Sequence, residues 1–354
     1  MQSQHSHEKM NIKNFRKPYI LIPTIILSIL FLIAAIGSWA VFTPFCSEKG
    51  NSYIYIDNND NADSVYQKLR PNAASVKILT FRLLCHFYDY QDKVKSGKYN
   101  IGNGLRTIDL FRNLRNGNQE PVRITIPSTR TLEQLVARIA PLIAPDSATL
   151  MKHFTDSIIC KEYGCTPHTI QTLFLPNTYE FYWNVTPQQF LARMKKESDR
   201  YWTDEKKEKA QKLGLTCQEI ITLASIVDQE TAYTPEKPAI ARMYLNRLEK
   251  DMPLQADPTI KYALKDFGLR RILHKHLTVD SPYNTYKNKG LPPGPISIPS
   301  MSSIEAVLNA DDNDFLYMCA KEDFSGSHNL ARSYNEHLQN ARKYTKALNE
   351  RGIK

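Results

Sequence analysis

One long apolar run near the start of the chain predicts a membrane helix. The run from Ile20 to Phe42 is 23 residues long and carries no charge. As a helix it would reach about 35 Å, enough to cross a hydrocarbon core of about 30 Å. Basic residues precede it, which predicts a cytoplasmic N-terminus. We therefore expect a cytoplasmic tail at 1–19, a transmembrane helix at 20–42 and an exported body after it. The alternative is a cleaved signal peptide, for which the run is long.

The segment from 52 to 126 alternates between strand and helix patterns. Residues 43–51 read as a short linker before it. Alternating apolar residues indicate half-buried strands, and helical spacing after a polar residue indicates short helices. The predicted strands are 52–56, 98–101 and 122–126, and the predicted helices begin near Asp63, at Val76 and at Thr107. A small α+β unit of this size is typical of a binding module.

Helical spacing dominates the remainder of the chain, from 127 to 354. Thr216 and Glu219 have the spacing of a capping box just before an apolar run. Residues 252–300 hold much of the proline and little regular pattern, and a long irregular segment inside a compact domain usually carries function. The predicted fold class is α+β: a transmembrane helix, a small α+β subdomain and a mainly helical catalytic domain with a long irregular substrate-groove segment.

Charge and cysteine usage narrow the chemistry. The formal net charge is +10, from 46 basic and 36 acidic residues, and it is spread along the chain. Such a diffuse excess favours a polyanionic surface but does not indicate nucleic acid. The six cysteines form no CxxC pattern, and Cys160 and Cys165 are spaced to close a short loop at most. His274 and His276 lack a third ligand, so we expect neither a metal nor a cofactor.

A single carboxylate, Glu230, stands near the end of the apolar helix. Asp228 lies two positions away and points to nearly the opposite face, so the two cannot form a catalytic pair. From spacing alone, Glu230 reads as a solvated glutamate at a helix end.

Several motifs in order add a resemblance to this picture. The segment Ala224–Thr231, with the sequence ASIVDQET, resembles the signature helix of the endolytic murein transglycosylases, the MltG or YceG-like family. The other matching motifs are Phe174–Phe181, Asn246–Leu248, Leu254–Thr259, Tyr283–Tyr286, Gly290–Ile296, His328 and His337. The likeness runs from about residue 52 to 345 and includes the leading membrane helix. The chain departs at Asp228, where the family commonly has Glu, and at Asn177, where it commonly has Asp.

The resemblance implies cleavage of the β-1,4 bond between N-acetylmuramic acid and N-acetylglucosamine in peptidoglycan. Glu230 would protonate the leaving oxygen, and the muramyl C6 hydroxyl would attack the anomeric carbon to leave a 1,6-anhydro end. Intramolecular attack has effective molarities of about 10⁵ M or more, so no water need be activated. A general acid at neutral pH needs a raised pKa, which burial supplies.

The same resemblance suggests which residues hold the substrate. The expected substrate-binding residues are Gln255, Asp257, Tyr283, Asn284, Thr285 and Tyr286. The alternatives are a turn with two core tyrosines at 283–286 and a helix cap at Asp257. His328 and His337 are interpreted as packed residues without an acid or base role.

The resemblance also suggests the domains, the binding partners and the cellular location of the protein. The segment 52–126 corresponds to a LysM-like subdomain that would hold glycan, or alternatively to a spacer, and 127–354 to the YceG-like catalytic domain. The expected partners are glycan strands, the inner (cytoplasmic) membrane and peptidoglycan synthases, with the catalytic domain on the periplasmic or extracytoplasmic side of a single-pass anchor. The enzyme would terminate nascent strands.

Two other functions stay open at this point. A muramidase would hydrolyse the same bond with a second carboxylate roughly 5–9 Å away, for which Glu180 and Asp257 are the candidates. A non-catalytic wall-binding scaffold predicts an exposed Glu230 with an ordinary pKa.

Overall fold

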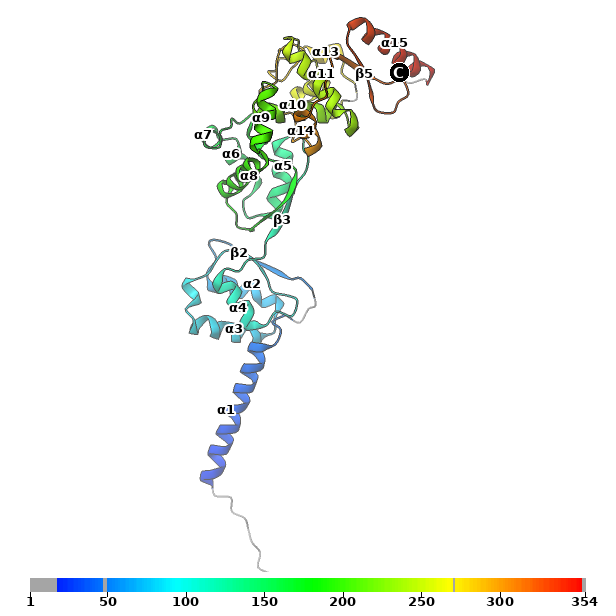
Figure 1. Cartoon of the computed structure of the whole chain (residues 1–354). Helices are drawn as coiled ribbons and strands as arrows, with labels where there is room; N and C mark the ends of the chain where they lie inside the picture. Colours follow the sequence, from blue (N-terminus) through cyan, green and yellow to red (C-terminus); the bar gives the residue numbers. More distant parts are fainter. Residues whose placement is uncertain (1–17, 47–49, 270, 352–354) are drawn as a thin grey trace, which may run out of the picture. The chain divides into compact units, whose positions relative to one another are not determined.

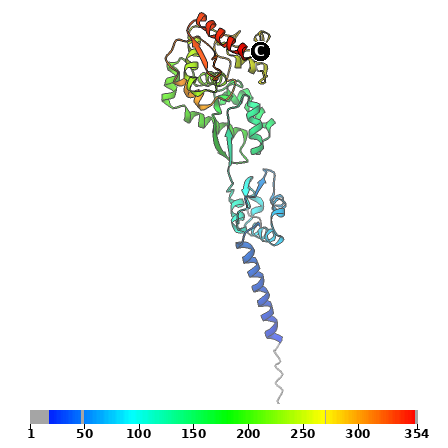
Figure 2. The ribbon, with the colours of Figure 1, turned by 90° about the vertical axis from the view of Figure 1, so that its right-hand side faces the viewer.

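The structure is a computed structural model that describes residues 18–46, 50–269 and 271–351. Most of the expected cytoplasmic tail and part of the expected linker, residues 47–49, lie outside the described residues. The chain forms two compact units, Met1–Glu120 and Pro121–Lys354, and each is described by itself (Figures 1 and 2).

The first unit begins with the apolar helix α1 and continues into a small mixed domain. Within α1 (Pro18–Phe42), the stretch Ile22–Phe42 has a mean hydropathy of 2.6 and is long enough to cross a membrane. The other elements are β1 (Tyr53–Ile56), α2 (Ala62–Leu69), η1 (Arg70–Asn72), α3 (Ser75–Phe87), η2 (Tyr90–Asp92), β2 (Gly97–Asn100) and α4 (Thr107–Asn116). Strands β1 and β2 pair antiparallel. The predicted strands and helices of this segment are therefore present.

Aromatic residues fill the core of the first unit. The Phe81 ring is at the centre, with ring centroids of Phe45, Tyr66, Tyr90 and Phe111 between 6.0 and 6.3 Å away. Edge-to-face packing of this kind adds to the burial of apolar area. The core is thus built from α2, α3, α4 and the chain after α1.

The third predicted strand belongs to the second unit. Strand β3 (Val122–Ile126) pairs antiparallel with β4 (Asn177–Phe181), with Ile124 opposite Tyr179. Because its partner lies far along the chain, β3 separates from the first unit, and the division falls at Glu120 rather than at the expected residue 126.

The second unit is mainly helical. Its remaining elements are α5 (Leu132–Ile139), η3 (Ala140–Leu142), α6 (Ser147–Phe154), α7 (Ser157–Glu162), η4 (Ile170–Leu173), α8 (Pro187–Tyr201), α9 (Asp204–Lys212), α10 (Cys217–Glu230), η5 (Thr234–Glu236), α11 (Lys237–Glu249), α12 (Asp257–Leu264), α13 (His274–Leu277), α14 (Met301–Leu308), β5 (Tyr317–Ala320), β6 (His328–Ala331) and α15 (Tyr334–Glu350). One core lies between the β3–β4 pair, α5, α6 and α8, and a second surrounds α10. Between α12 and α14 the chain is largely irregular, as expected for 252–300.

Helix α10 is the central helix of the second core. Its capping box is present: Thr216 Oγ1 accepts a hydrogen bond from the Glu219 amide (3.2 Å), and the Glu219 carboxylate accepts one from the Thr216 amide (2.8 Å). Every residue from Ile220 to Val227 is buried. A helix that is apolar on all sides is buried on all sides, and α11, α12 and α14 pack around this one. The packing fixes the position of its last turn, which carries Glu230.

Candidate active site

Glu230 borders a cavity of about 320 Å³ in the second unit. The end of α10, one face of α11, the chain before α12, the β5–β6 pair and the start of α15 surround it. The lining residues are Glu230, Met243, Tyr244, Arg247, Leu254, Gln255, Asp257, Tyr286, Tyr317, Met318, Cys319, Ala320, His328, Tyr334 and His337. The cavity therefore brings together segments that are far apart in the sequence.

The carboxyl group of Glu230 is half-buried and its pKa is raised. Burial raises the pKa of Glu230 to about 7, against the hydrogen bond from Tyr244, which lowers it. The charge of Asp257 raises it further. A carboxyl group with a pKa near neutrality can donate a proton and take one back at physiological pH. The solvated helix-end glutamate that spacing suggested is not what the structure has.

Tyr244 holds the carboxyl group of Glu230 in place. Its hydroxyl donates to Glu230 Oε1 at 2.7 Å. The Tyr244 side chain is buried, and burial together with the charge of Glu230 raises its pKa well above the ordinary value. The Tyr244 phenol thus stays protonated and donates its hydrogen bond to Oε1 of Glu230. The other carboxyl oxygen, Oε2, does not bond to Tyr244.

Arg247 places a buried positive charge beside the cavity. It donates to the backbone carbonyls of Leu316 (2.6 Å) and Leu254 (2.8 Å), which tie α11 to β5 and to the chain before α12. Its guanidinium carbon lies 5.4 Å from the centroid of the Tyr317 ring. Among the described residues, no carboxylate forms an ion pair with it. Its charge lowers the pKa of Glu230, although less than burial raises it.

Three of the six expected substrate-binding residues line the cavity. Gln255 is exposed, with a left-handed backbone (φ 50°), and its side chain accepts from Arg247 at 3.4 Å. Asp257, in the first turn of α12, accepts a hydrogen bond from the Tyr286 hydroxyl at 2.6 Å. The N-cap of α12 is Ala256, so Asp257 is not the helix cap.

The other three, Tyr283, Asn284 and Thr285, are buried outside the cavity. The Asn284 amide donates to the carbonyls of Leu277 and Val279, which fixes the irregular loop. Thr285 accepts from the amide of Ala256 at 3.0 Å. Tyr283 packs against Tyr262, with ring centroids 4.7 Å apart. The polar groups of Asn284 and Thr285 serve the loop backbone, and the Tyr283 hydroxyl lies 3.4 Å from Nδ1 of His168. The structure thus places these three outside the cavity, where they shape the segment that presents its neighbours.

Both histidines of the resemblance lie on the cavity. His328 is held by Glu236, whose carboxylate accepts from its backbone amide (2.9 Å) and lies 3.0 Å from its ring Nδ1. The His337 ring stacks on Tyr317 with centroids 5.7 Å apart. Burial, and the charge of Arg247, lower the pKa of His337, so it is neutral near pH 7. Both are packed, as expected, yet both also form the wall.

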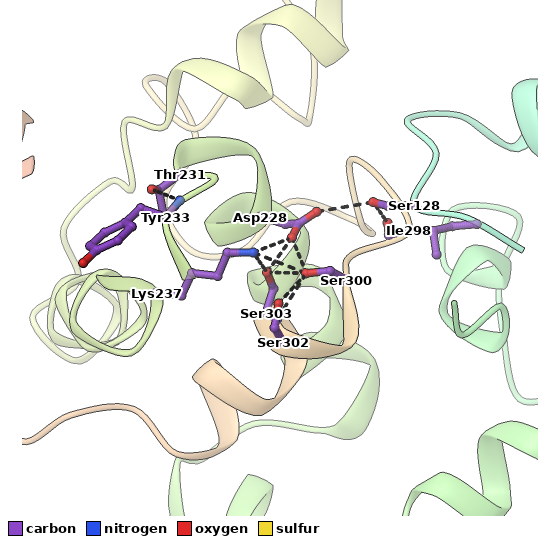
Figure 3. A network of polar contacts seen from close by, with 9 residues as sticks. All are labelled: Ser128, Asp228, Thr231, Tyr233, Lys237, Ile298, Ser300, Ser302 and Ser303. Carbon is purple, nitrogen blue, oxygen red and sulfur yellow. Dashed lines mark hydrogen bonds and ion pairs between the residues drawn. The ribbon is translucent and has the colours of Figure 1, made fainter. Parts of the chain in front are cut away.

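Asp228 does not line the cavity and lies in a polar network (Figure 3). It accepts from Lys237 Nζ (2.9 Å) and from the hydroxyls of Ser300 (2.5 Å) and Ser303 (2.6 Å). Burial alone would raise the pKa of Asp228, but these bonds and the lysine charge hold it below the ordinary value. Ser128 joins the network and also donates to the Ile298 carbonyl, which links the chain after β3 to the segment before α14. Asp228 is therefore a structural anchor.

The other candidate groups lie elsewhere. Glu180 is exposed on β4, where it pairs with Arg123, and it does not line the cavity. Asp257 is thus the second carboxylate of the site.

All six cysteines are free thiols, so Cys160 and Cys165 do not close a loop. Within the described part of the chain, no group of three metal-binding side chains is found.

Some lining residues carry no role in the sequence interpretation. Tyr244, Tyr317 and Tyr334 were not singled out, and Arg247 appeared only within a matching motif. Tyr244 and Arg247 are three apart on α11, which places them on one helix face. That spacing alone would not have distinguished them from the buried residues around them.

A mainly helical unit that holds one carboxyl group of near-neutral pKa beside a cavity defines a class of protein: an enzyme that works by general acid–base catalysis. The comparisons with known proteins are more specific. The chain belongs to the YceG-like family, whose model matches residues 54–343.

Characterised relatives and a solved structure are similar over most of the chain. A protein of Bacillus subtilis (strain 168) named endolytic murein transglycosylase is 33% identical over 276 residues, which is 73% of this chain and 75% of that protein. A protein of the same name from Streptococcus pneumoniae (strain D39) is 32% identical over 68% of this chain and 49% of its own length. A crystal structure of a yceG-like protein from Listeria monocytogenes matches with a TM-score of 0.52 and 28% identity, covering 82% of this chain and 98% of that one.

Proposed function

We propose that the chain is a membrane-anchored endolytic lytic transglycosylase that cleaves the bond between N-acetylmuramic acid and N-acetylglucosamine in peptidoglycan. Family membership and the names of the relatives support the peptidoglycan transglycosylase activity. The observation that carries the assignment to a site is Glu230, a half-buried acid with a pKa raised to about 7 on the wall of a cavity.

Glu230 acts first as an acid and then as a base. Its proton goes to the glycosidic oxygen as the bond to the anomeric carbon breaks. The C6 hydroxyl of the same muramyl residue forms the new bond to that carbon, and its proton returns to Glu230. The step consumes no water, and the enzyme ends as it began. The hydroxyl of Tyr244 holds Oε1, so Oε2 is the oxygen that faces the substrate.

The substrate lies against polar and aromatic groups on the cavity wall. Gln255 and Asp257 offer hydrogen-bonding groups to sugar hydroxyls and N-acetyl groups, and Tyr286 orients Asp257. Tyr317 and Tyr334 present aromatic rings for stacking on sugar faces. Tyr283, Asn284 and Thr285 act indirectly, by fixing the loop that carries Tyr286.

A muramidase is the second candidate, because Asp257 shares the cavity with Glu230. Its charge adds to the raised pKa of Glu230, so the two carboxyl groups interact. A hydrolase would use Asp257 to activate water or to attack the anomeric carbon. The hydrogen bond from the Tyr286 hydroxyl favours a substrate-positioning role for Asp257 instead. The scaffold function is disfavoured by the half-buried, pKa-shifted Glu230.

The first unit determines where in the cell envelope the enzyme works. The apolar helix α1 spans the inner membrane once, with its N-terminus in the cytoplasm and both folded units outside. The mixed domain of the first unit holds glycan in the manner of a LysM-like module. In this location the enzyme works beside peptidoglycan synthases and terminates nascent strands.

Digestion of purified sacculi by the full chain in detergent tests the proposal. We expect muropeptides that end in 1,6-anhydro-N-acetylmuramic acid, which are one water lighter than hydrolysed ends by mass spectrometry. The Glu230→Gln variant should release anhydro ends more slowly by about 10³-fold or more, while remaining folded. Reducing ends in place of anhydro ends would establish the muramidase, and intact sacculi would establish the scaffold.

A further inference from the structure

The outer face of α3 is an exposed apolar stripe in the first unit. Leu79, Leu83 and Phe87 are 59%, 49% and 76% exposed. Because they are four residues apart, they follow one another along a single helix face. The outward face of a soluble helix normally carries polar residues, and a contiguous apolar patch marks a surface that meets something apolar.

Helix α3 is fixed to the end of α1. From the buried side of α3, Lys77 donates to the carbonyl oxygens of Ala40 (3.0 Å) and Thr43 (3.2 Å). Its Nζ also lies 4.7 Å from the centroid of the Trp39 ring. The last carbonyls of a helix have no partner within the helix, so these bonds complete the C-terminal end of α1. Figure 1 shows α3 beside this end of α1, within the same unit.

The length of α1 sets the level of this junction in a bilayer. The apolar stretch runs from Ile22 to Phe42 and covers about 32 Å at 1.5 Å per residue. A hydrocarbon core is about 30 Å thick. The stretch therefore has little surplus length, and its last turn, from Trp39 to Phe42, reaches the level of the headgroups, where tryptophan is enriched. Since α3 is bonded to this turn, α3 lies at the same level.

We propose that α3 is an interfacial helix, which inserts Leu79, Leu83 and Phe87 into the lipid surface next to α1. The proposal rests on the membrane span of α1 proposed above. Arg82 and His86 are exposed on the same side of α3 and reach the phosphate groups of the lipids. A second attachment beside α1 stops the first unit from rotating freely about a single helix and holds it flat on the membrane.

The test measures contact with lipid at single positions of the full chain. Cys217 and Cys319, the two cysteines that are not buried, are replaced by serine. Leu83→Cys is then labelled with a polarity-sensitive fluorophore, and the protein is reconstituted into vesicles of phosphatidylcholine and phosphatidylglycerol. Lipids spin-labelled near the headgroup should quench the fluorophore at 83 several-fold more than at two exposed control positions, Asn118→Cys after α4 and Ile158→Cys on α7.

A label at Phe31→Cys, within α1, separates the two proposals. Quenching at 31 by lipids spin-labelled deep in the acyl chain, together with quenching at 83, supports both. Quenching at 31 with a signal at 83 no larger than at 118 overturns the interfacial helix alone. Absence of quenching at 31 overturns the span and, with it, the interfacial helix. A fluorophore at 83 that is shielded only at high protein-to-lipid ratio, without lipid quenching, would mean that a second copy covers the stripe.

Discussion

Asp228 and Glu230 lie two residues apart at the end of α10, on opposite sides of the helix. The pKa of one carboxyl group is lowered and the pKa of the other is raised. On one side, Lys237 and two serines surround Asp228 and hold its pKa below the ordinary value. On the other, burial raises the pKa of Glu230 to about 7, with the Tyr244 phenol as its one hydrogen-bond partner among the described residues. Burial acts on both groups, so the difference comes from the donors and the cation that each one meets. One helix end thus supplies an anchor on one face and an acid on the other.

The largest effect is expected from Glu230→Gln, which removes only the proton that the reaction needs. General acid catalysis typically contributes about 10²–10⁴-fold, and we expect the rate of anhydro-end formation to fall by about 10³-fold or more. Mass spectrometry of digested sacculi measures the rate. The Asp228→Asn variant is the comparison on the other side of the helix, and each folded molecule of it should keep most of its activity. Equal losses of activity in the two variants would contradict the division of roles.

The next effect concerns the anchor. Lys237→Met leaves Asp228 buried without its cation, and removing one partner of a buried ion pair costs about 3 kcal/mol or more. Urea unfolding of the full chain in detergent, followed by circular dichroism, measures the loss. The matched control is Arg123→Met, whose pair with Glu180 has side chains 78% and 57% exposed. Such an exposed pair contributes about 1 kcal/mol at most, so similar losses in both variants would refute the anchor.

Local patterns were sufficient for much of the fold but for little of the site. The charge-free run predicted α1, and the Thr216–Glu219 spacing predicted the start of α10, because capping depends only on neighbours in sequence. The acidity of Glu230 depends on burial and on side chains from α11 and α12, which no local pattern brings together. From periodicity alone it read as solvated, and only the family resemblance singled it out.

Residues 283–285 show what residue type alone leaves open. Their amide, hydroxyl and phenol groups are of the types that bind sugars, yet all three lie outside the cavity, where Asn284 and Thr285 hydrogen-bond the backbone of an irregular loop. A loop without regular hydrogen bonds needs such partners for its buried carbonyls and amides. Residue type therefore could not separate Asn284 from Tyr286, which does reach the cavity.

The pH dependence of stability distinguishes the two carboxyl groups with a smaller effect. Between pH 4.5 and about 7, the unfolded chain loses the proton of Glu230 while the folded protein keeps it, so stability falls as the pH rises. Glu230→Gln should abolish this loss and be more stable than the parent by about 3 kcal/mol at pH 8. For Asp228 the sign is opposite: its contribution is fully present above the ordinary carboxyl pKa of 3.8 and is lost as the pH falls below 3.8 through the lowered pKa of the folded state. Urea unfolding from pH 4 to 8 should show the difference between parent and Glu230→Gln growing with pH, and a constant difference would rule out the raised pKa.

The smallest effect is expected from Tyr244→Phe, which removes the hydrogen bond from Tyr244 to Glu230 and keeps the ring. That bond lowers the pKa of Glu230, so its loss should raise the pKa further above 7. The alkaline limb of the pH–rate profile should then move to higher pH, while the maximal rate falls by about ten-fold because the acid is no longer held in one orientation. Anhydro-end release measured across the pH range tests both changes. Tyr334→Phe is the matched control, since Tyr334 also lines the cavity but is 58% exposed. If the limb moves equally in both variants, or moves to lower pH in Tyr244→Phe, then Tyr244 does not set the acidity of Glu230.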